Sequence, residues 1–147
     1  MAAVRYCRAM KHIVAIEGTY EGDLRVRAVH GPSGNSVVTD APKDNEGKER
    51  GFSPTDLVAT ALGTCILTIL GIHARRRGLE LTGARFRTTK EMAAAPLRRI
   101  ARLVTTLTLP KTLGLEDRRV LEAAARTCPV TASLHSDVEA ALEFRYE

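Results

Sequence analysis

Residues 53–78 constrain the fold more than any other part of the sequence; they read S-P-T-D-L-V-A-T-A-L-G-T-C-I-L-T-I-L-G-I-H-A-R-R-R-G. Ser53 is a favourable N-cap, and Pro54 suits the first position of a helix. Asp56 adds a negative charge where the helix dipole favours one, and the three arginines before the final glycine complement the opposite end. We therefore predict one long helix over about residues 54–77.

This helix is apolar over most of its circumference. Its apolar residues recur at helical spacing: Leu57, Val58, Ala61, Leu62, Cys65, Ile66, Ile69, Leu70 and Ile72. A face this wide predicts a central, mostly buried helix rather than one lying on the surface. The apolar part covers only about 16 residues and contains threonine and glycine, so the sequence predicts no membrane-spanning segment.

Short segments before the helix, whose side chains would alternate between two faces of a strand, predict an antiparallel β-meander over about residues 11–40. We expect its strands at 13–16, 24–30 and 36–39, with glycine-containing turns at 18–22 and 31–34. Residues 40–52 are polar and read as a loop of about a dozen residues, a length that is often functional in a compact domain.

The part after the helix, about residues 79–147, reads as a β-α-β segment. We expect strands at 79–89, 100–109 and 138–146, a helix at 115–126 and a short helix ending near 134. In the helix at 115–126, the residues predicted to face inward are Leu115, Val120, Leu121 and Ala124. The order of elements predicts an α+β fold with antiparallel sheets around the long helix, as a single domain.

Two thiols stand out in this scheme. Cys65 lies in the middle of the apolar helix, and a buried cysteine there often behaves as an inert hydrophobe. Cys128 precedes Pro129, which fits the first position of a second helix. Backbone N–H groups at that position favour a thiolate on Cys128.

The cysteine count, the charge and the N-terminal sequence limit the functions that this chain can have. The chain has 147 residues, three cysteines and a formal net charge of +5. The cysteines form neither a secreted disulfide framework nor a zinc-binding pattern with His73 and His135, and Cys7 has no motif around it. The basic residues are dispersed without interleaved aromatics, which disfavours nucleic-acid binding. The N-terminus lacks an apolar signal core, so we expect a cytoplasmic protein without a bound metal or cofactor.

The segments around the two thiols resemble the OsmC/Ohr family of osmotically inducible and organic hydroperoxide resistance proteins. The motifs are S-P-T-D-L-V-A-T-A-L-G-T-C at 53–65 and T-C-P-V-T-A-S-L at 127–134, with the cysteines 128 − 65 = 63 residues apart. The segments G-D-L-R-V-R-A-V-H-G-P-S-G and V-V-T-D-A-P also resemble the OsmC-like branch. The resemblance covers nearly the whole chain after about Lys11.

The resemblance implies an intertwined homodimer in which the two cysteine helices pack centrally and two active sites lie at the subunit interface. It implies a thiol peroxidase that reduces organic hydroperoxides or hydrogen peroxide at the expense of a dithiol. Cys65 would be the peroxidatic cysteine and Cys128 the resolving one. The helix-cap argument favours the reverse assignment, and both remain open at this point.

The group that activates the thiolate departs from the family pattern. Ohr proteins usually carry a glutamate ten residues before the first cysteine, where this chain has Thr55. Asp56 and Glu49 are the alternative acids, although Asp56 also suits a plain helix start. The candidate cations lie on the second strand and the loop: Arg25, Arg27 and Arg50. A rival of another class is a binding protein of the same fold, which holds a hydrophobic ligand at the dimer interface without significant peroxidase activity.

Overall fold

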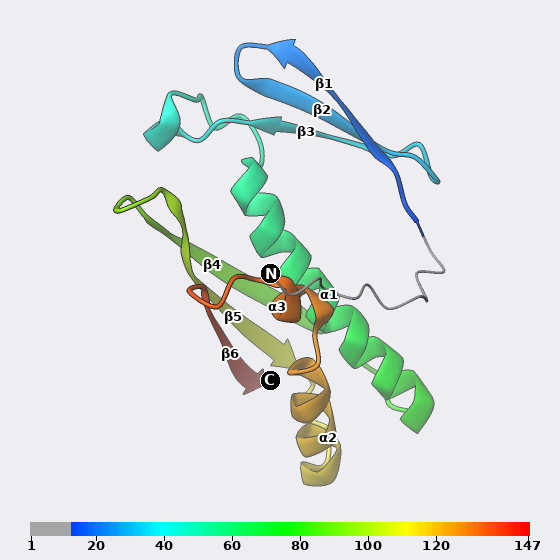
Figure 1. Ribbon diagram of the computed structural model, residues 1–147. Helices are drawn as coiled ribbons and strands as arrows, with labels where there is room; N and C mark the ends of the chain where they lie inside the picture. Colours follow the sequence, from blue (N-terminus) through cyan, green and yellow to red (C-terminus); the bar gives the residue numbers. More distant parts are fainter. Residues whose placement is uncertain (1–12) are drawn as a thin grey trace, which may run out of the picture. The chain divides into compact units, whose positions relative to one another are not determined.

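The computed structural model describes residues 13–147, so the motif-free Cys7 lies outside the described residues. The chain forms two compact units, Met1–Pro54 and Thr55–Glu147. Each unit contains its own three-stranded sheet (Figure 1), with strand order β1-β2-β3 in the first sheet and β4-β5-β6 in the second.

The first unit contains β1 (Ile16–Gly22), β2 (Arg25–His30) and β3 (Ser36–Asp40), all paired antiparallel. The meander is therefore confirmed, but the turn expected at 18–22 is wrong because β1 runs through it. The chain reverses instead at Asp23 and Leu24, which have φ of +52° and +59°. Two consecutive residues with positive φ match the right-handed twist of a tight hairpin, which explains why the reversal falls there.

Hydrogen bonds join the two ends of the loop after β3, and the loop contains the short 3₁₀ helix η1 (Lys43–Asn45). The Asp40 N–H donates to the Phe52 carbonyl at 3.0 Å, and the Asp40 carboxylate accepts from Arg50 Nε at 2.7 Å. The side-chain and backbone hydrogen bonds from Arg50 lower the pKa of Asp40 to about 2. A β-carbon at Gly47 would overlap the Ala41 carbonyl, so glycine is required at this close approach.

The second unit begins with α1 (Pro54–Arg77), whose bounds match the predicted helix. The other elements are β4 (Arg85–Ala93), β5 (Arg99–Leu109), α2 (Leu115–Ala125), α3 (Pro129–Ser133) and β6 (Glu139–Tyr146). β4 and β5 pair antiparallel, whereas β5 and β6 run parallel. The parallel pair departs from the expected antiparallel arrangement because α2 and α3 form a crossover that returns the chain in the original direction.

The hydrophobic core of the second unit lies between α1, the second sheet and α2 (Figure 1). Its fully buried members include Leu62, Ile66, Leu70, Leu103, Leu107 and Leu121. Leu121 and Ala124 face inward as predicted, but Leu115 is 74% exposed because it is the first residue of α2. The strand expected from residue 79 begins only at Arg85, since Thr82 and Gly83 form a turn and Gly83 has φ of +88°.

By length and composition alone, α1 is apolar enough to cross a membrane. The helix has 24 residues, so it is longer than the apolar segment of about 16 residues from which the sequence predicted no membrane span. Its row of buried residues, including Leu62 and Leu70, packs on the core of the second unit. Only 33% of the apolar stretch is buried, so this packing accounts for one side of α1 and leaves the other side exposed.

Candidate thiol site

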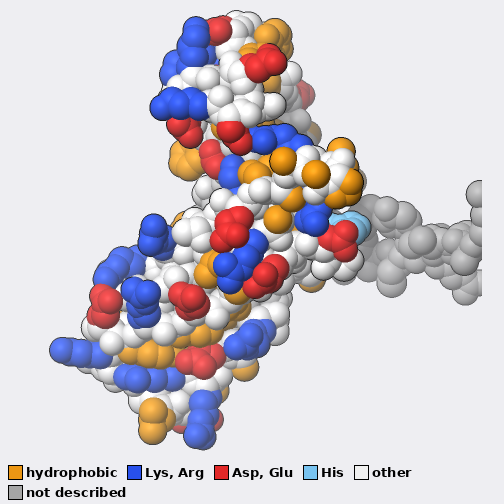
Figure 2. Space-filling view, turned by 90° about the vertical axis from the view of Figure 1, so that its left-hand side faces the viewer, with side chains coloured by type: hydrophobic (Ala, Val, Ile, Leu, Met, Phe, Trp, Pro, Cys, Tyr) orange, Lys and Arg blue, Asp and Glu red, His pale blue; other side chains and the backbone are white. Residues whose placement is uncertain are grey.

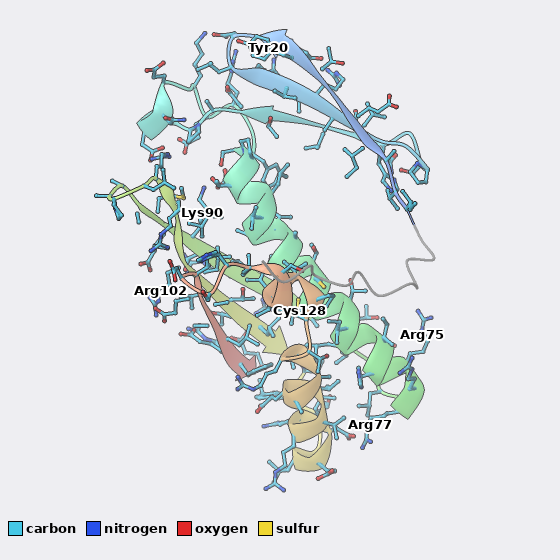
Figure 3. All side chains as sticks on the ribbon, in the orientation of Figure 1. Tyr20, Arg75, Arg77, Lys90, Arg102 and Cys128 are labelled. Atoms are coloured by element: carbon cyan, nitrogen blue, oxygen red, sulfur yellow. The ribbon has the colours of Figure 1, made fainter. Side chains whose placement is uncertain are left out.

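The fold of the second unit brings Cys65 and Cys128 together from distant parts of the chain. Cys65 lies in the middle of α1, one residue from the buried Ile66, and is partly exposed. Cys128 lies between α2 and α3 and is only 1% exposed (Figure 3). Both thiols are free, and each shifts the pKa of the other. The two side chains therefore lie close to each other.

The start of α3 influences the acidity of both thiols. Cys128 is the N-cap residue of α3 and is followed by a proline at the first position, as predicted. The Val130 backbone lowers the pKa of both thiols, and the backbone and side chain of Thr131 lower the pKa of Cys128. The start of α3 therefore stabilises a thiolate on Cys128 more than one on Cys65.

The two thiols have opposite acidities. Burial raises the pKa of Cys65, and its hydrogen bond with Cys128 raises it further, against the smaller effect of Val130. Burial also acts to raise the pKa of Cys128, but the hydrogen bonds from Thr131, Cys65 and Val130 outweigh it and lower that pKa. The surroundings therefore disfavour a thiolate on Cys65 and favour one on Cys128.

Asp56 forms an ion pair inside the second unit. Lys90 on β4 extends its Nζ to Asp56 Oδ1 at 2.6 Å and to Thr55 Oγ1 at 2.7 Å (Figure 3). The Lys90 side chain is only 15% exposed. Lys90 was not among the residues predicted from the sequence. Its position on the inward side of the predicted strand was a usable signal, because a buried lysine nearly always has a partner.

The other candidate residues belong to the first unit. Glu49 pairs with Lys43 at 3.4 Å. Arg27 pairs with Glu21 at 2.6 Å, and Arg50 pairs with Asp40. Arg25 differs from both: its Nε is buried and has no hydrogen-bond partner within the described part of the chain.

No metal centre accompanies the thiols within residues 13–147, where no group of three or more His, Cys, Asp or Glu side chains is placed to hold an ion. The chemistry that this arrangement offers is thiol chemistry. Two neighbouring thiols, one partly exposed and one with a lowered pKa, can exchange a proton or form a disulfide.

Comparison with known proteins shows the family to which the chain is similar. The family model described as OsmC-like protein matches residues 46–143. A crystal structure from Psychrobacter arcticus 273-4, provisionally described as an osmotic stress induced and detoxification response protein, is 40% identical, with a TM-score of 0.84 over 91% of this chain and 97% of that one.

More distant structures share the fold. An organic hydroperoxide resistance protein from Elizabethkingia anophelis is 12% identical, with a TM-score of 0.73 over 92% of this chain and 97% of that one. OhrB of Bacillus subtilis is 15% identical, with a TM-score of 0.67 over 91% of this chain and 98% of that one. A search of curated proteins finds no significant match. With a family model that covers most of its length and a relative at 40% identity, the chain belongs to the OsmC-like family.

Proposed function

We propose that this protein is a cytoplasmic thiol-dependent peroxidase that reduces organic hydroperoxides or hydrogen peroxide through the Cys65/Cys128 pair. The observation that carries the proposal is that two thiols 63 residues apart in the sequence lie close enough for each to shift the pKa of the other. The hydroperoxide resistance proteins among its structural relatives support the same chemistry.

Access to solvent assigns the two roles. The attacking sulfur must be reached in line with the O–O bond, and Cys65 is partly exposed whereas Cys128 is 1% exposed. Cys65 is therefore the peroxidatic cysteine of the proposal. The lowered pKa of Cys128 suits a resolving cysteine, because it increases the share of thiolate available for the attack on Cys65.

The proposed reaction balances within the pair. Transfer of the Cys65 proton to Cys128 gives a Cys65 thiolate, which attacks the terminal peroxide oxygen. The O–O bond breaks, Cys65 becomes a sulfenic acid, and the leaving alkoxide takes the proton from Cys128 to form an alcohol. The Cys128 thiolate then attacks the Cys65 sulfur, which forms a disulfide and expels hydroxide. A dithiol reductant restores both thiols and is itself oxidised to a disulfide.

We assign the activating cation to Arg25. Of the three candidate arginines, Arg27 and Arg50 are each held by a carboxylate, whereas the Nε of Arg25 is buried without a hydrogen-bond acceptor among the described residues. Asp56 and Glu49 remain the proposed orienting acids. Each already binds a lysine of its own unit, and a carboxylate has two oxygens with which to serve a second cation.

A peroxide-consumption assay tests this function. With a small dithiol as reductant, the protein should consume cumene hydroperoxide, tert-butyl hydroperoxide or hydrogen peroxide catalytically, because each turnover regenerates the thiol pair. The control is the same protein with both thiols alkylated. If none of the three peroxides is turned over, the enzyme proposal fails and the ligand-binding alternative replaces it.

We also propose that the working form is a homodimer whose two units act as one OsmC-like domain. The first unit has no buried apolar residue in its described part, where the buried residues are Thr39, Asp40 and Ser53. Its sheet nonetheless exposes large apolar side chains: Ile16, Tyr20, Leu24 and Val26. A three-stranded sheet needs a packing partner for its apolar face, and a second copy of the chain would supply one.

The exposed side of α1 is suited to the same contact. Thr60, Thr64 and Thr68 each donate their hydroxyl to a carbonyl of the preceding turn, so they present methyl groups outward. Ala61 and Ile72 are exposed on the same helix. A helix side of small residues with satisfied hydroxyls allows another helix to approach closely.

Sedimentation at micromolar concentration should therefore give about twice the chain mass of 16.0 kDa. Thr64→Arg should shift the protein towards the monomer, because it places a charge on the proposed contact. Thr89→Arg, on an exposed position of β4, is the matched control and should leave the dimer intact. A clean 16.0 kDa species for the unmodified chain would overturn the dimer and the interfacial site with it.

A further inference from the structure

The outer face of the second sheet carries charges that the thiol chemistry does not use. Inward residues of β5, such as Leu103 and Leu107, pack on the core, and the intervening residues face the other way. Figure 2 shows one face of the molecule, on which lysine and arginine side chains lie among acidic ones. Some arginines of the outer face have carboxylate partners; Arg102, for example, pairs with Glu91 and Glu139.

A hollow of about 220 Å³ opens on this face at the end near the chain terminus. Its floor is the central strand, where Thr106 and Thr108 are short and half-buried. The strand register places Arg85 on β4 and Arg145 on β6 on either side of Thr108. Because neighbouring strands lie about 4.8 Å apart, the two arginines stand on strands roughly 10 Å apart with a low floor between them.

Two guanidinium groups at this hollow have no acceptor. Arg85 binds the Glu147 carboxylate, and the Thr106 hydroxyl donates to Glu143 at 2.9 Å. Arg87 and Arg145 also line the hollow, and within residues 13–147 neither makes a hydrogen bond or ion pair. The lining residues include three arginines and one glutamate, so their formal charge is 3 − 1 = +2.

We propose that this hollow is a binding site for a phosphate dianion, either inorganic phosphate or a phosphomonoester. Planar guanidinium groups on two strands match the several oxygens of a tetrahedral phosphate, and the Thr108 hydroxyl adds a donor from the floor. Arg87 and Arg145, which have no partner among residues 13–147, supply two positive charges for a dianion. A long polyanion fits poorly, because Glu143 and Glu147 interrupt the basic surface along β6 and the chain beyond it.

The test is isothermal titration calorimetry of the full chain with inorganic phosphate, at low ionic strength and at a pH where phosphate is a dianion. Saturable binding is expected, and Arg87→Ala/Arg145→Ala should weaken it by about tenfold or more, since each charge-assisted hydrogen bond contributes strongly. Phenyl phosphate is titrated in parallel, and its affinity is compared with that of inorganic phosphate. The ligand that binds more tightly shows whether the site prefers the free ion or a phosphomonoester.

The matched control is Arg76→Ala/Arg126→Ala, which removes the same charge from exposed positions on α1 and after α2. This control should bind phosphate as the unmodified chain does. Arg87→Lys keeps the charge but loses the planar fork, so it should give an intermediate affinity without risk to the fold. Absence of saturable phosphate binding, or equal weakening by both double variants, would overturn the site. Neither outcome bears on the thiol pair, because the site stands independently of the proposed peroxidase.

Discussion

Replacing Gly63 with alanine should lower the free energy of unfolding by about 1–2 kcal/mol, because overpacking costs more than the helix propensity of alanine gains. Gly63 is buried on α1, and a β-carbon there would overlap the ring of Phe86 on β4. The ring is stiff and lies against the core, so either α1 or β4 must shift. Urea denaturation at fixed protein concentration measures the change.

Gly71 provides the matched control on the same helix. A β-carbon at Gly71 meets no atom within 4 Å, so Gly71→Ala should stabilise the protein by up to about 1 kcal/mol through helix propensity alone. Phe86→Leu combined with Gly63→Ala should recover part of the loss, because it removes the overlapping ring. Equal effects of the two glycine substitutions would contradict close packing between α1 and β4.

The sequence predicted α1 best because several independent signals agree there. Ser53, Pro54 and the closing arginines mark its ends, and the apolar spacing between them is helical over the full length. The turn at 18–22 was wrong because glycine also occurs inside strands, and the hairpin used Asp23 and Leu24 instead. The parallel direction of β6 depends on how α2 and α3 pack, which no local pattern records.

Only the site residues that lie in a recognisable sequence motif could be predicted. The Cys65/Cys128 pair was anticipated from two motifs and their spacing, and the structure brings the thiols close to each other. The pairing of Asp56 with Lys90 was not anticipated, because a contact between residues 34 positions apart requires the register of β4 against the start of α1. The carboxylate partners of Arg27 and Arg50 were not anticipated either, because no local sequence pattern records them.

Substitution of either thiol should divide the proposed mechanism into its two steps. Cys65→Ser should abolish peroxide consumption, because no other group in the proposal attacks the O–O bond. Cys128→Ser should react with peroxide once and then stop as a sulfenic acid, or proceed to a sulfinic acid with excess peroxide, because no resolving thiol is present. The expected loss of steady-state turnover is complete in both variants, so the state of the remaining sulfur distinguishes them.

The reversed assignment predicts the opposite pattern. Cys128 has the lowered pKa, so a mechanism governed by acidity alone would make it the attacking thiol. In that case Cys128→Ser would leave an inert Cys65, and Cys65→Ser would be the variant that over-oxidises at Cys128. Burial of Cys128 opposes this outcome, since the peroxide must reach the attacking sulfur.

Mass spectrometry of thiol-containing peptides after a short, stoichiometric peroxide pulse tests the central claim most directly. In the unmodified chain, the proposal predicts an intramolecular Cys65–Cys128 disulfide with Cys7 still open to alkylation. In Cys128→Ser, it predicts one or two added oxygens on Cys65. If neither thiol gains mass or forms the disulfide faster than a free cysteine in solution reacts, the pair is not a peroxidase site and the proposed function is contradicted.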